Sequence, residues 1–302
     1  MEIKVIETKN LVKIYSSPFM RKKTYGVNGL DLDVIQGEIF GLLGPNGAGK
    51  TTTLKIITGL LKPTSGYVKL WGGIDMIQAK KKMGFLPENP SFYRHLNGLE
   101  LLRFYSRLYD KNIELKDLEK TLDLVGLKKE RTKRISNYSK GMIQRIGFAQ
   151  ALIGDPDLLI LDEPLGGLDP IGRKELKDLI QKVNEKGKTI LFSSHILSDV
   201  EAICNRVGII IEGKMKKIGY LREILKTDIR YTDIEIAEIE DKEWLKEYGK
   251  MRDEGDIIFL RTLDEVKKDR VIKLITEKGG RIISVAPQRE SLEEHFLKTV
   301  HE

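Results

Sequence analysis

The chain has 302 residues, of which 40% are hydrophobic, enough for the core of one large domain or of two unequal ones. It has no apolar run near the roughly 20 residues of a membrane-spanning helix, and residues 1–9 are charged and lack an apolar signal core, so we expect a cytoplasmic protein. The single cysteine, Cys204, excludes an intramolecular disulfide and a cysteine-only metal site.

The net charge of +7 is unevenly distributed along the chain. Residues 1–219 hold 36 basic and 25 acidic side chains, a net charge of +11, whereas residues 220–302 hold 16 and 20, a net charge of −4. This change predicts a domain boundary near Gly219. A basic first part is compatible with ATP, an anionic membrane surface or nucleic acid as a partner.

The first expected elements are strands at 3–11, 30–34 and 39–43, followed by the segment Gly44–Thr52 and a helix over 53–60. The segment satisfies the phosphate-loop pattern Gly-x4-Gly-Lys-Ser/Thr, and it lies between a buried strand and a helix, as that loop requires. A glycine-rich turn without function is the alternative. The flanking strand and helix favour a nucleotide site.

The residue types of this loop suit a phosphate group. Successive N–H groups at a helix N-terminus bind phosphate oxygens, so we expect nucleotide contacts from Asn46, Gly47, Ala48, Gly49, Lys50, Thr51 and Thr52. Lys50 supplies a cation for the β- and γ-phosphates, and Thr51 offers a hydroxyl to Mg2+. The loop therefore predicts a bound nucleotide together with Mg2+.

Further strands are expected at 66–70, 82–86, 158–161, 189–192 and 207–211. A helix is expected over 98–109, opened by a capping box of Asn97 and Glu100. One face of this helix is apolar, and we expect it to be buried rather than to form a partner groove: Leu101, Leu102, Tyr105 and Leu108. The alternation of strands and helices predicts an α/β domain with the nucleotide at the C-terminal ends of the strands.

Two carboxylates, Asp162 and Glu163, follow the apolar strand 158–161. An acidic residue at the end of a buried strand is costly unless a cation neutralises it. In a phosphate-loop enzyme that cation is Mg2+, so we expect Asp162 to approach the metal beside Thr51. Glu163 can face the γ-phosphate and activate the attacking water as a general base. A pair of helix-capping residues is the alternative.

With these motifs placed, the chain resembles the ATP-binding subunit of an ABC transporter over nearly its whole length. The additional motifs are Asn137–Met142 at the position of the signature sequence, Gly167–Asp169 after the acidic strand, and Ser193–His195 at the switch histidine. The resemblance implies the P-loop NTPase fold of an ABC ATPase in residues 1–219. This α/β domain would have a mixed sheet and a helical subdomain at about residues 90–155.

The resemblance also implies site residues outside the phosphate loop. His195 would contact the γ-phosphate, and Asp169 would lie at the nucleotide. Ser139 caps an expected helix over 140–153, and its hydroxyl and the helix N–H groups, with Gly141, would form a second anion site. The family uses that site in trans, on ATP held by a second subunit. Two copies of this chain would therefore share two ATP sites, and we expect a homodimer.

The chain departs from the common family pattern at two places. Lys140 stands in the signature where glycine is usual, and its role stays open between a phosphate cation and a solvated side chain. Glu88 stands where most members carry a glutamine that touches Mg2+, and a carboxylate can still ligate the metal. Both features are similar to a branch of exporter ATPases. Residues 89–110 would then form the docking surface for an integral membrane permease.

An aromatic residue for the adenine ring is expected upstream of the phosphate loop. Tyr15 is at the family's position for this residue, and base–aromatic stacking contributes roughly 1–3 kcal/mol. Tyr25 is a rival, because the loop from Ser16 to Thr24 is longer than usual in the family. A half-buried position at a strand end is the alternative interpretation of Tyr15.

Residues 220–302 are predicted to form a small C-terminal α+β accessory domain. Strands are expected at 234–239, 256–261 and 281–285, a helix at 265–277, and a capping box at Ser291–Glu294 that opens a last helix. No residue of this part suggests catalysis. A structural or dimer-stabilising role is favoured over the sensing of a ligand.

Together these observations predict an ATP-hydrolysing motor subunit of an ABC-type exporter. It would be peripheral on the inner face of the cell membrane, bound there through its permease. A non-transport ABC ATPase acting on nucleic acid or ribosomes is the alternative, disfavoured because such relatives usually carry two ATP modules or long insertions. A small-molecule kinase is a third possibility, which the signature and His195 oppose.

Overall fold

The computed structural model describes residues 3–17, 20–109, 113–224 and 231–288. The chain divides into two compact units, Met1–Leu221 and Arg222–Glu302, which are described separately below. In the described parts of the chain, every helix is too short or too polar to span a membrane. The expected capping box at Ser291–Glu294 lies outside the described residues.

The first unit is built on a six-stranded sheet in the order β5-β6-β7-β3-β8-β9. Its strands are β3 (Ile39–Leu43), β5 (Met83–Leu86), β6 (Leu158–Leu161), β7 (Thr189–Ser194), β8 (Arg206–Ile211) and β9 (Lys214–Tyr220). The first five are parallel, and β9 runs antiparallel to β8. Every residue of β3, β6 and β7 is buried, which confirms the prediction of buried parallel strands in a mixed sheet.

A second, antiparallel sheet has the order β2-β1-β4, with β1 (Lys4–Ser17), β2 (Met20–Ile35) and β4 (Ser65–Leu70). The loop predicted between Ser16 and Thr24 is wrong, because β1 and β2 stay paired as far as Ser17 and Met20. Only residues 18 and 19 separate the two strands, so the insertion lengthens a hairpin. This hairpin matters for function because Tyr15 pairs with Thr24 within it.

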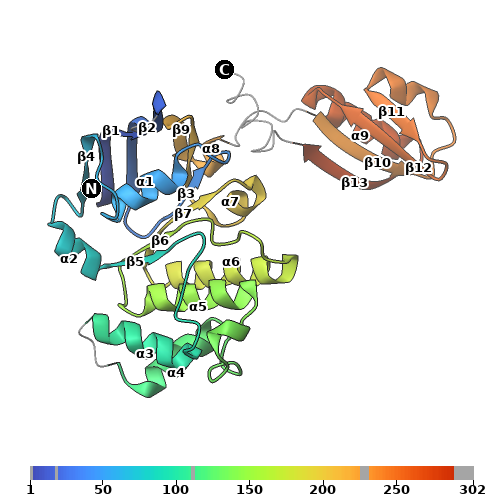
Figure 1. The fold of residues 1–302 in the computed structure, drawn as a ribbon. Coiled ribbons are helices and arrows are strands. Elements are labelled where there is room, and N and C mark those ends of the chain that lie inside the picture. The colour runs from blue at the N-terminus through green and yellow to red at the C-terminus, as the bar shows by residue number, and fades with distance from the viewer. Residues whose placement is uncertain (1–2, 18–19, 110–112, 225–230, 289–302) are drawn as a thin grey trace. The chain divides into compact units, whose positions relative to one another are not determined.

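Helices cover these sheets and complete the core of the first unit (Figure 1). They are α1 (Lys50–Ile57), α2 (Met76–Lys81), α6 (Pro170–Asn184) and α7 (Leu197–Ile203). The short helix α8 (Leu221–Ile224) spans the boundary between the two units. Leu54 and Ile57 of α1 belong to one buried cluster that also contains Leu30 of the antiparallel sheet and Phe40 of the central sheet. Helix α1 therefore joins the two sheets, and the phosphate loop that precedes it is held from both sides.

Between β5 and β6 the chain forms a mostly helical segment, the lower part of Figure 1. It contains α3 (Gly98–Leu108), α4 (Leu115–Leu124), the 3-10 turn η1 (Ile135–Asn137) and α5 (Lys140–Leu152). Both hydrogen bonds of the predicted Asn97–Glu100 capping box are present. The apolar face of α3 is only partly buried: Leu101 and Leu102 are inaccessible, whereas 64% of Leu108 is exposed. The expectation of a fully buried face is therefore wrong at its C-terminal end.

The second unit has an antiparallel sheet in the order β11-β12-β10-β13. Its elements are β10 (Tyr231–Ala237), η2 (Glu243–Glu247), β11 (Lys250–Asp253), β12 (Ile257–Thr262), α9 (Glu265–Glu277) and β13 (Arg281–Gln288). Alternate residues of β10 and β12 pack with Val271 and Ile275 of α9 in a separate hydrophobic core. The described part of the unit is α+β. The short strand β11, with a single apolar residue, and the 3-10 helix η2 were missing from the sequence prediction.

Candidate nucleotide site

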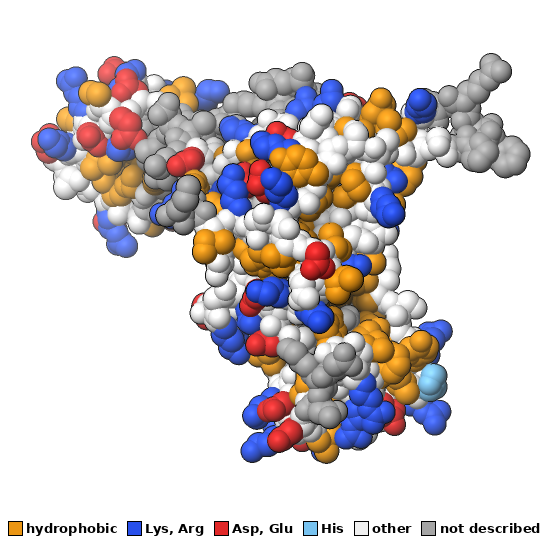
Figure 2. All heavy atoms as spheres, turned by 90° about the vertical axis from the view of Figure 1, so that its left-hand side faces the viewer, with side chains coloured by type: hydrophobic (Ala, Val, Ile, Leu, Met, Phe, Trp, Pro, Cys, Tyr) orange, Lys and Arg blue, Asp and Glu red, His pale blue; other side chains and the backbone are white. Residues whose placement is uncertain are grey.

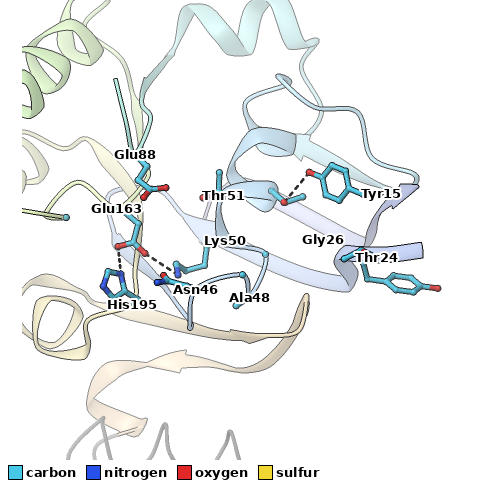
Figure 3. A pocket seen from close by; sticks show the side chains of 15 residues that line it. Tyr15, Thr24, Gly26, Asn46, Ala48, Lys50, Thr51, Glu88, Glu163 and His195 are labelled. Atoms are coloured by element: carbon cyan, nitrogen blue, oxygen red, sulfur yellow. Dashed lines mark hydrogen bonds and ion pairs between the residues drawn. The ribbon is translucent and has the colours of Figure 1, made fainter. Parts of the chain in front are cut away.

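A cavity of about 510 Å³ opens above the C-terminal end of β3 (Figure 3). Eleven of the expected site residues line it: Tyr15, Asn46, Gly47, Ala48, Gly49, Lys50, Thr51, Thr52, Glu88, Glu163 and His195. Four further residues complete the lining: Thr24, Tyr25, Gly26 and Gly166. The fold therefore brings the β1–β2 hairpin, the phosphate loop and the ends of β5, β6 and β7 to one place.

The phosphate loop depends on glycine at two left-handed positions. Gly47 has φ +81° and Gly49 has φ +106°, a region that residues with a side chain rarely adopt. A Cβ on Gly49 would also collide with the carbonyl oxygen of Gly26 in β2. Helix α1 begins directly after Gly49, at Lys50, so its free N–H groups face the cavity. This arrangement suits a phosphate group.

The Lys50 side chain is 6% exposed, and its ammonium is fully engaged by the protein. It donates to the carbonyl oxygens of Gly44 at 2.7 Å and of Pro45 at 3.2 Å. Its third contact is an ion pair with Glu163 Oε1 at 3.1 Å. Glu163 therefore neutralises the buried cation of the phosphate loop in this structure.

Glu163 lies between Lys50 and His195, as Figure 3 shows. Its second oxygen, Oε2, is 2.9 Å from His195 Nδ1. The residue follows β6 with φ +48°, which is strained for a residue with a side chain and is common at functional sites. Its backbone N–H donates to Ser193 Oγ at 2.9 Å, which holds this turn against β7.

Asp162 lies one residue earlier and is 1% exposed. Its Oδ1 accepts hydrogen bonds from Ser193 Oγ at 2.7 Å and from Thr51 Oγ1 at 3.1 Å. Burial raises the pKa of Asp162 above its ordinary value, and these two hydrogen bonds act in the opposite direction. A cation at this place would remove the cost of the buried charge, so the predicted pairing of Thr51 with Asp162 suits a Mg2+ site.

Glu88 reaches the same cavity from the end of β5, and its side chain is exposed. Among the described residues, no group of three or more Asp, Glu, His or Cys side chains is placed to hold a metal by itself. The side-chain oxygens that could contribute to a metal site here are the carboxylates of Asp162 and Glu88 and the Thr51 hydroxyl. The remaining ligands for Mg2+ would have to be phosphate oxygens and water.

Tyr15 projects from β1 towards the start of α1. Its hydroxyl is 3.3 Å from Thr52 Oγ1, and 44% of the residue is exposed. Tyr25 also lines the cavity, with 49% exposed. Tyr15 is paired with Thr24 close to the C-terminal end of β1.

Three expected nucleotide contacts lie outside this cavity: Ser139, Gly141 and Asp169. Ser139 caps α5 by accepting a hydrogen bond from the Met142 N–H at 3.3 Å, as the sequence predicted. Asp169 caps α6, and its Oδ1 accepts from the Gly172 N–H at 3.0 Å. One chain therefore does not bring the signature segment to its own phosphate loop.

Lys140, whose role the sequence left open, extends across the loop between Glu163 and Asp169. A Cβ on Gly167 would collide with the Lys140 ammonium, and Gly167 itself has φ +70°. No hydrogen bond or ion pair to a described residue engages that ammonium. The Lys140 side chain thus lies against Gly167, and among the described residues nothing pairs with its charge.

Two supporting residues were missed from the sequence. Ser193 is fully buried and joins Asp162 to the backbone of Glu163, and its only signal was a hydroxyl at the end of a strand parallel to β6. Asp199 of α7 is 2% exposed and accepts an ion pair from Arg173 of α6 at 2.5 Å, with Lys177 at 3.5 Å. This contact holds α7, which follows His195, against α6, which follows Asp169.

The comparisons with known proteins agree with this site. Residues 27–166 match the family described as ABC transporter. An ABC transporter ATP-binding protein of Nostoc sp. is 41% identical, over 98% of this chain and 90% of its own length. The bacitracin transport ATP-binding protein BcrA of Enterococcus faecalis is 36% identical, over 98% of this chain and 96% of its own.

Solved structures support the same assignment. A structure described as the ATP-binding subunit of an ABC transporter has a TM-score of 0.62 and 29% identity, over 73% of this chain and 91% of that one. A dimeric ATP-binding cassette bound to ADP and Pi has a TM-score of 0.66 at 24% identity, over 72% and 99%, and shows the shared P-loop NTPase fold. The chain therefore belongs to the ABC transporter ATP-binding proteins, the ATPase subunits of these transporters.

Proposed function

We propose that this protein is the motor subunit of an exporter, and that it hydrolyses ATP to drive a separate membrane permease. The observation that carries the catalytic part is the position of Glu163, whose two oxygens meet Lys50 at 3.1 Å and His195 at 2.9 Å at the wall of the cavity. The exporter part is supported by the two BcrA proteins, which are named for bacitracin transport.

In the proposed site the phosphate loop binds the triphosphate of ATP. The N–H groups of the loop and of the first turn of α1 contact phosphate oxygens, and Lys50 exchanges part of its present contacts for them. Tyr15 provides the ring on which adenine stacks. Because Lys50 is paired with Glu163 in this structure, phosphate binding releases the Glu163 carboxylate for another role.

Glu163 then serves as the general base. Its Oε2 accepts a proton from the attacking water, while the 2.9 Å contact with His195 Nδ1 fixes the direction of the carboxylate. His195 contacts the γ-phosphate and donates a hydrogen bond to it. Thr51, Asp162 and Glu88 would hold Mg2+, which supplies compensation for the negative charge of the phosphates when it is bound.

We further propose that each ATP site is built from two copies of the chain. Ser139, Gly141 and Asp169 lie outside the cavity formed by their own phosphate loop, so a second subunit has to bring them to the nucleotide. The Ser139 hydroxyl and the N-terminus of α5 then bind the γ-phosphate from the opposite side. The ammonium of Lys140, at the same helix terminus, has the charge for that contact.

Dimer formation can be tested with two variants. Glu163→Gln protein is expected to be largely monomeric without nucleotide and dimeric with ATP and Mg2+. Adding Ser139→Arg places a bulky side chain at the N-terminus of α5 and blocks the shift, while ATP binding to the monomer stays nearly intact. If sedimentation shows the double variant dimerising with ATP as readily as its parent, Ser139 is not part of a shared site.

The proposed docking surface for the permease is the aromatic segment 89–110. Tyr93 packs edge-on against Phe104 with ring centroids 5.5 Å apart, and Phe104 packs in the same way against Tyr105. A groove of about 400 Å³ lies beside them, lined by Thr58, Leu60, Lys80, Met83, Phe85, Pro87, Tyr105, Tyr109 and Gln150. Hydrophobic side chains gather on the lower part of the first unit in Figure 2. A permease held there would place the protein at the inner face of the cell membrane.

The proposed coupling to a permease is tested by measuring ATPase activity in proteoliposomes with and without a candidate membrane protein whose gene is found next to that of this chain. The permease is expected to stimulate hydrolysis. Tyr93→Asp, at a residue 55% exposed, should remove the stimulation and preserve basal hydrolysis. Tyr67→Asp on β4, 44% exposed, is the matched control and should behave as wild type. Equal stimulation of both variants would remove segment 89–110 from the interface.

The described residues that line the nucleotide cavity all belong to the first unit. We propose that it has a structural or dimer-stabilising role. Comparing sedimentation of Glu163→Gln protein with a Glu163→Gln version that ends after Leu221, both with ATP and Mg2+, tests this role. An equal dimer fraction in both would contradict it.

A further inference from the structure

The Tyr15 ring is held in a defined position by contacts within the protein. Its hydroxyl is 3.3 Å from Thr52 Oγ1, in the first turn of α1. The Lys13 ammonium lies 5.7 Å from the ring centroid, within the range of a cation–π contact. Lys13 is itself fixed by a 2.9 Å hydrogen bond to the carbonyl oxygen of Lys62. Contacts within the protein therefore fix the orientation of the ring.

Gly26 of β2 is the residue that makes room for this position. A Cβ on Gly26 would lie 2.6 Å from Tyr15 Cε2, and 3.2 Å from both Cγ2 and Oγ1 of Thr52. Real Cβ atoms do not approach other atoms as closely as 2.6 Å, so any side chain at position 26 would displace the ring. Figure 3 shows Gly26 next to Thr24 at the edge of the cavity that Tyr15 also lines.

The backbone does not demand glycine at this position. Gly26 does not adopt the left-handed backbone conformation, with positive φ, that Gly29, Gly37 and other glycines of the described chain adopt. Glycine is therefore needed at this position because it leaves room for the Tyr15 ring, and not because of its backbone conformation. Because Tyr15 is 44% exposed, a Cβ at position 26 would move the ring outward and leave the strand in place.

We propose that Gly26 is a positioning residue for the nucleobase: it sets the height and tilt of the Tyr15 ring over the phosphate loop. This inference rests on the proposed function, in which adenine stacks on Tyr15. Stacking requires the ring face at a fixed distance from the base while the phosphates are held by the loop. Gly26 therefore determines how well one rigid ligand satisfies both contacts.

The test compares two probes, ATP and inorganic triphosphate, on purified full-length protein. Gly26→Ala should weaken ATP binding roughly 5-fold or more, because the displaced ring loses about 1 kcal/mol or more of the stacking contribution, and should leave inorganic triphosphate binding within about 2-fold of wild type. Tyr15→Ala should weaken ATP alone by roughly 5- to 150-fold, the range for one stacked base. In the Tyr15→Ala background, Gly26→Ala should have no further effect, because the ring it displaces is gone.

Each outcome bears on one claim. If Tyr15→Ala leaves ATP affinity unchanged, the adenine platform of the proposed function is wrong. If Tyr15→Ala weakens ATP but Gly26→Ala does not, the positioning role of Gly26 is wrong. Equal loss of ATP and inorganic triphosphate in Gly26→Ala also overturns the inference, since the substitution would then act through the phosphate loop. Should Gly26→Ala melt at a lower temperature, recovery in the double variant supports the collision with Tyr15, and no recovery contradicts it.

Discussion

Replacing Glu163 by glutamine should destabilise the nucleotide-free protein through Lys50. The two charges are 3.1 Å apart, and Lys50 and Glu163 are 6% and 9% exposed. At an effective dielectric constant of about 20, their gross attraction is about 5 kcal/mol, and removing one partner of such a buried pair typically costs about 3–5 kcal/mol. Lys50 keeps its hydrogen bonds to Gly44 and Pro45, so we expect the lower end, about 3 kcal/mol.

This cost corresponds to a fall in melting temperature of about 6–12 °C for a unit of this size. Scanning fluorimetry without nucleotide measures it. Inorganic triphosphate should remove most of the difference in melting temperature between wild type and Glu163→Gln, because phosphate oxygens then neutralise Lys50 in both proteins. Glu119→Gln is the matched control, since its ion pair with Arg131 spans 3.6 Å between side chains more than 40% exposed, and it should shift the transition little.

An unchanged melting temperature for Glu163→Gln would refute the reasoning, because the buried pair would then contribute nothing to the empty site. A deficit that persists in saturating triphosphate would also contradict it. In that case the Lys50 ammonium would not exchange its contact with the Glu163 carboxylate for contacts with phosphate oxygens.

Three further predictions concern single residues. Lys50→Ala should weaken binding of ATP itself, measured by nucleotide titration, because it removes the cation that compensates the phosphates. Glu88→Gln should change the Mg2+ dependence of ATPase activity only slightly, whereas Glu88→Ala should raise the Mg2+ concentration needed for half-maximal activity. Identical curves of activity against Mg2+ concentration for wild type and Glu88→Ala would show that Glu88 does not contact the metal. Burial raises the pKa of the Cys204 thiol well above its ordinary value, so at pH 8 the thiolate should be scarce and alkylation slow until the protein is unfolded. Rapid native labelling would contradict that prediction.

The parts of the fold that the sequence predicted well are those with strong local patterns. The strand before the phosphate loop is an apolar run, and its five residues are all buried in the structure. The Asn97–Glu100 box and the Ser139 cap follow from short-range hydrogen bonds between neighbouring residues, and both are present. Local signals of this kind depend little on the rest of the chain.

The parts that the sequence did not predict depend on contacts between distant segments. The extension of the β1–β2 hairpin through Ser17 and Met20 comes from cross-strand pairing. The link from Ser193 to Asp162 requires β6 and β7 to be neighbours in the sheet. Gly26 belongs to no motif that the sequence reveals, because its proposed role depends on the Tyr15 ring, which lies beside it only in the folded chain.

The measurement that tests the central claim most directly is steady-state phosphate release from ATP by wild type and Glu163→Gln in the presence of Mg2+. If Glu163 is the general base, the variant should lose roughly 100-fold or more of the activity, the usual contribution of such a group, and still bind ATP. Phosphate release near the wild-type rate would reject Glu163 as the base and, with it, the proposed mechanism of hydrolysis.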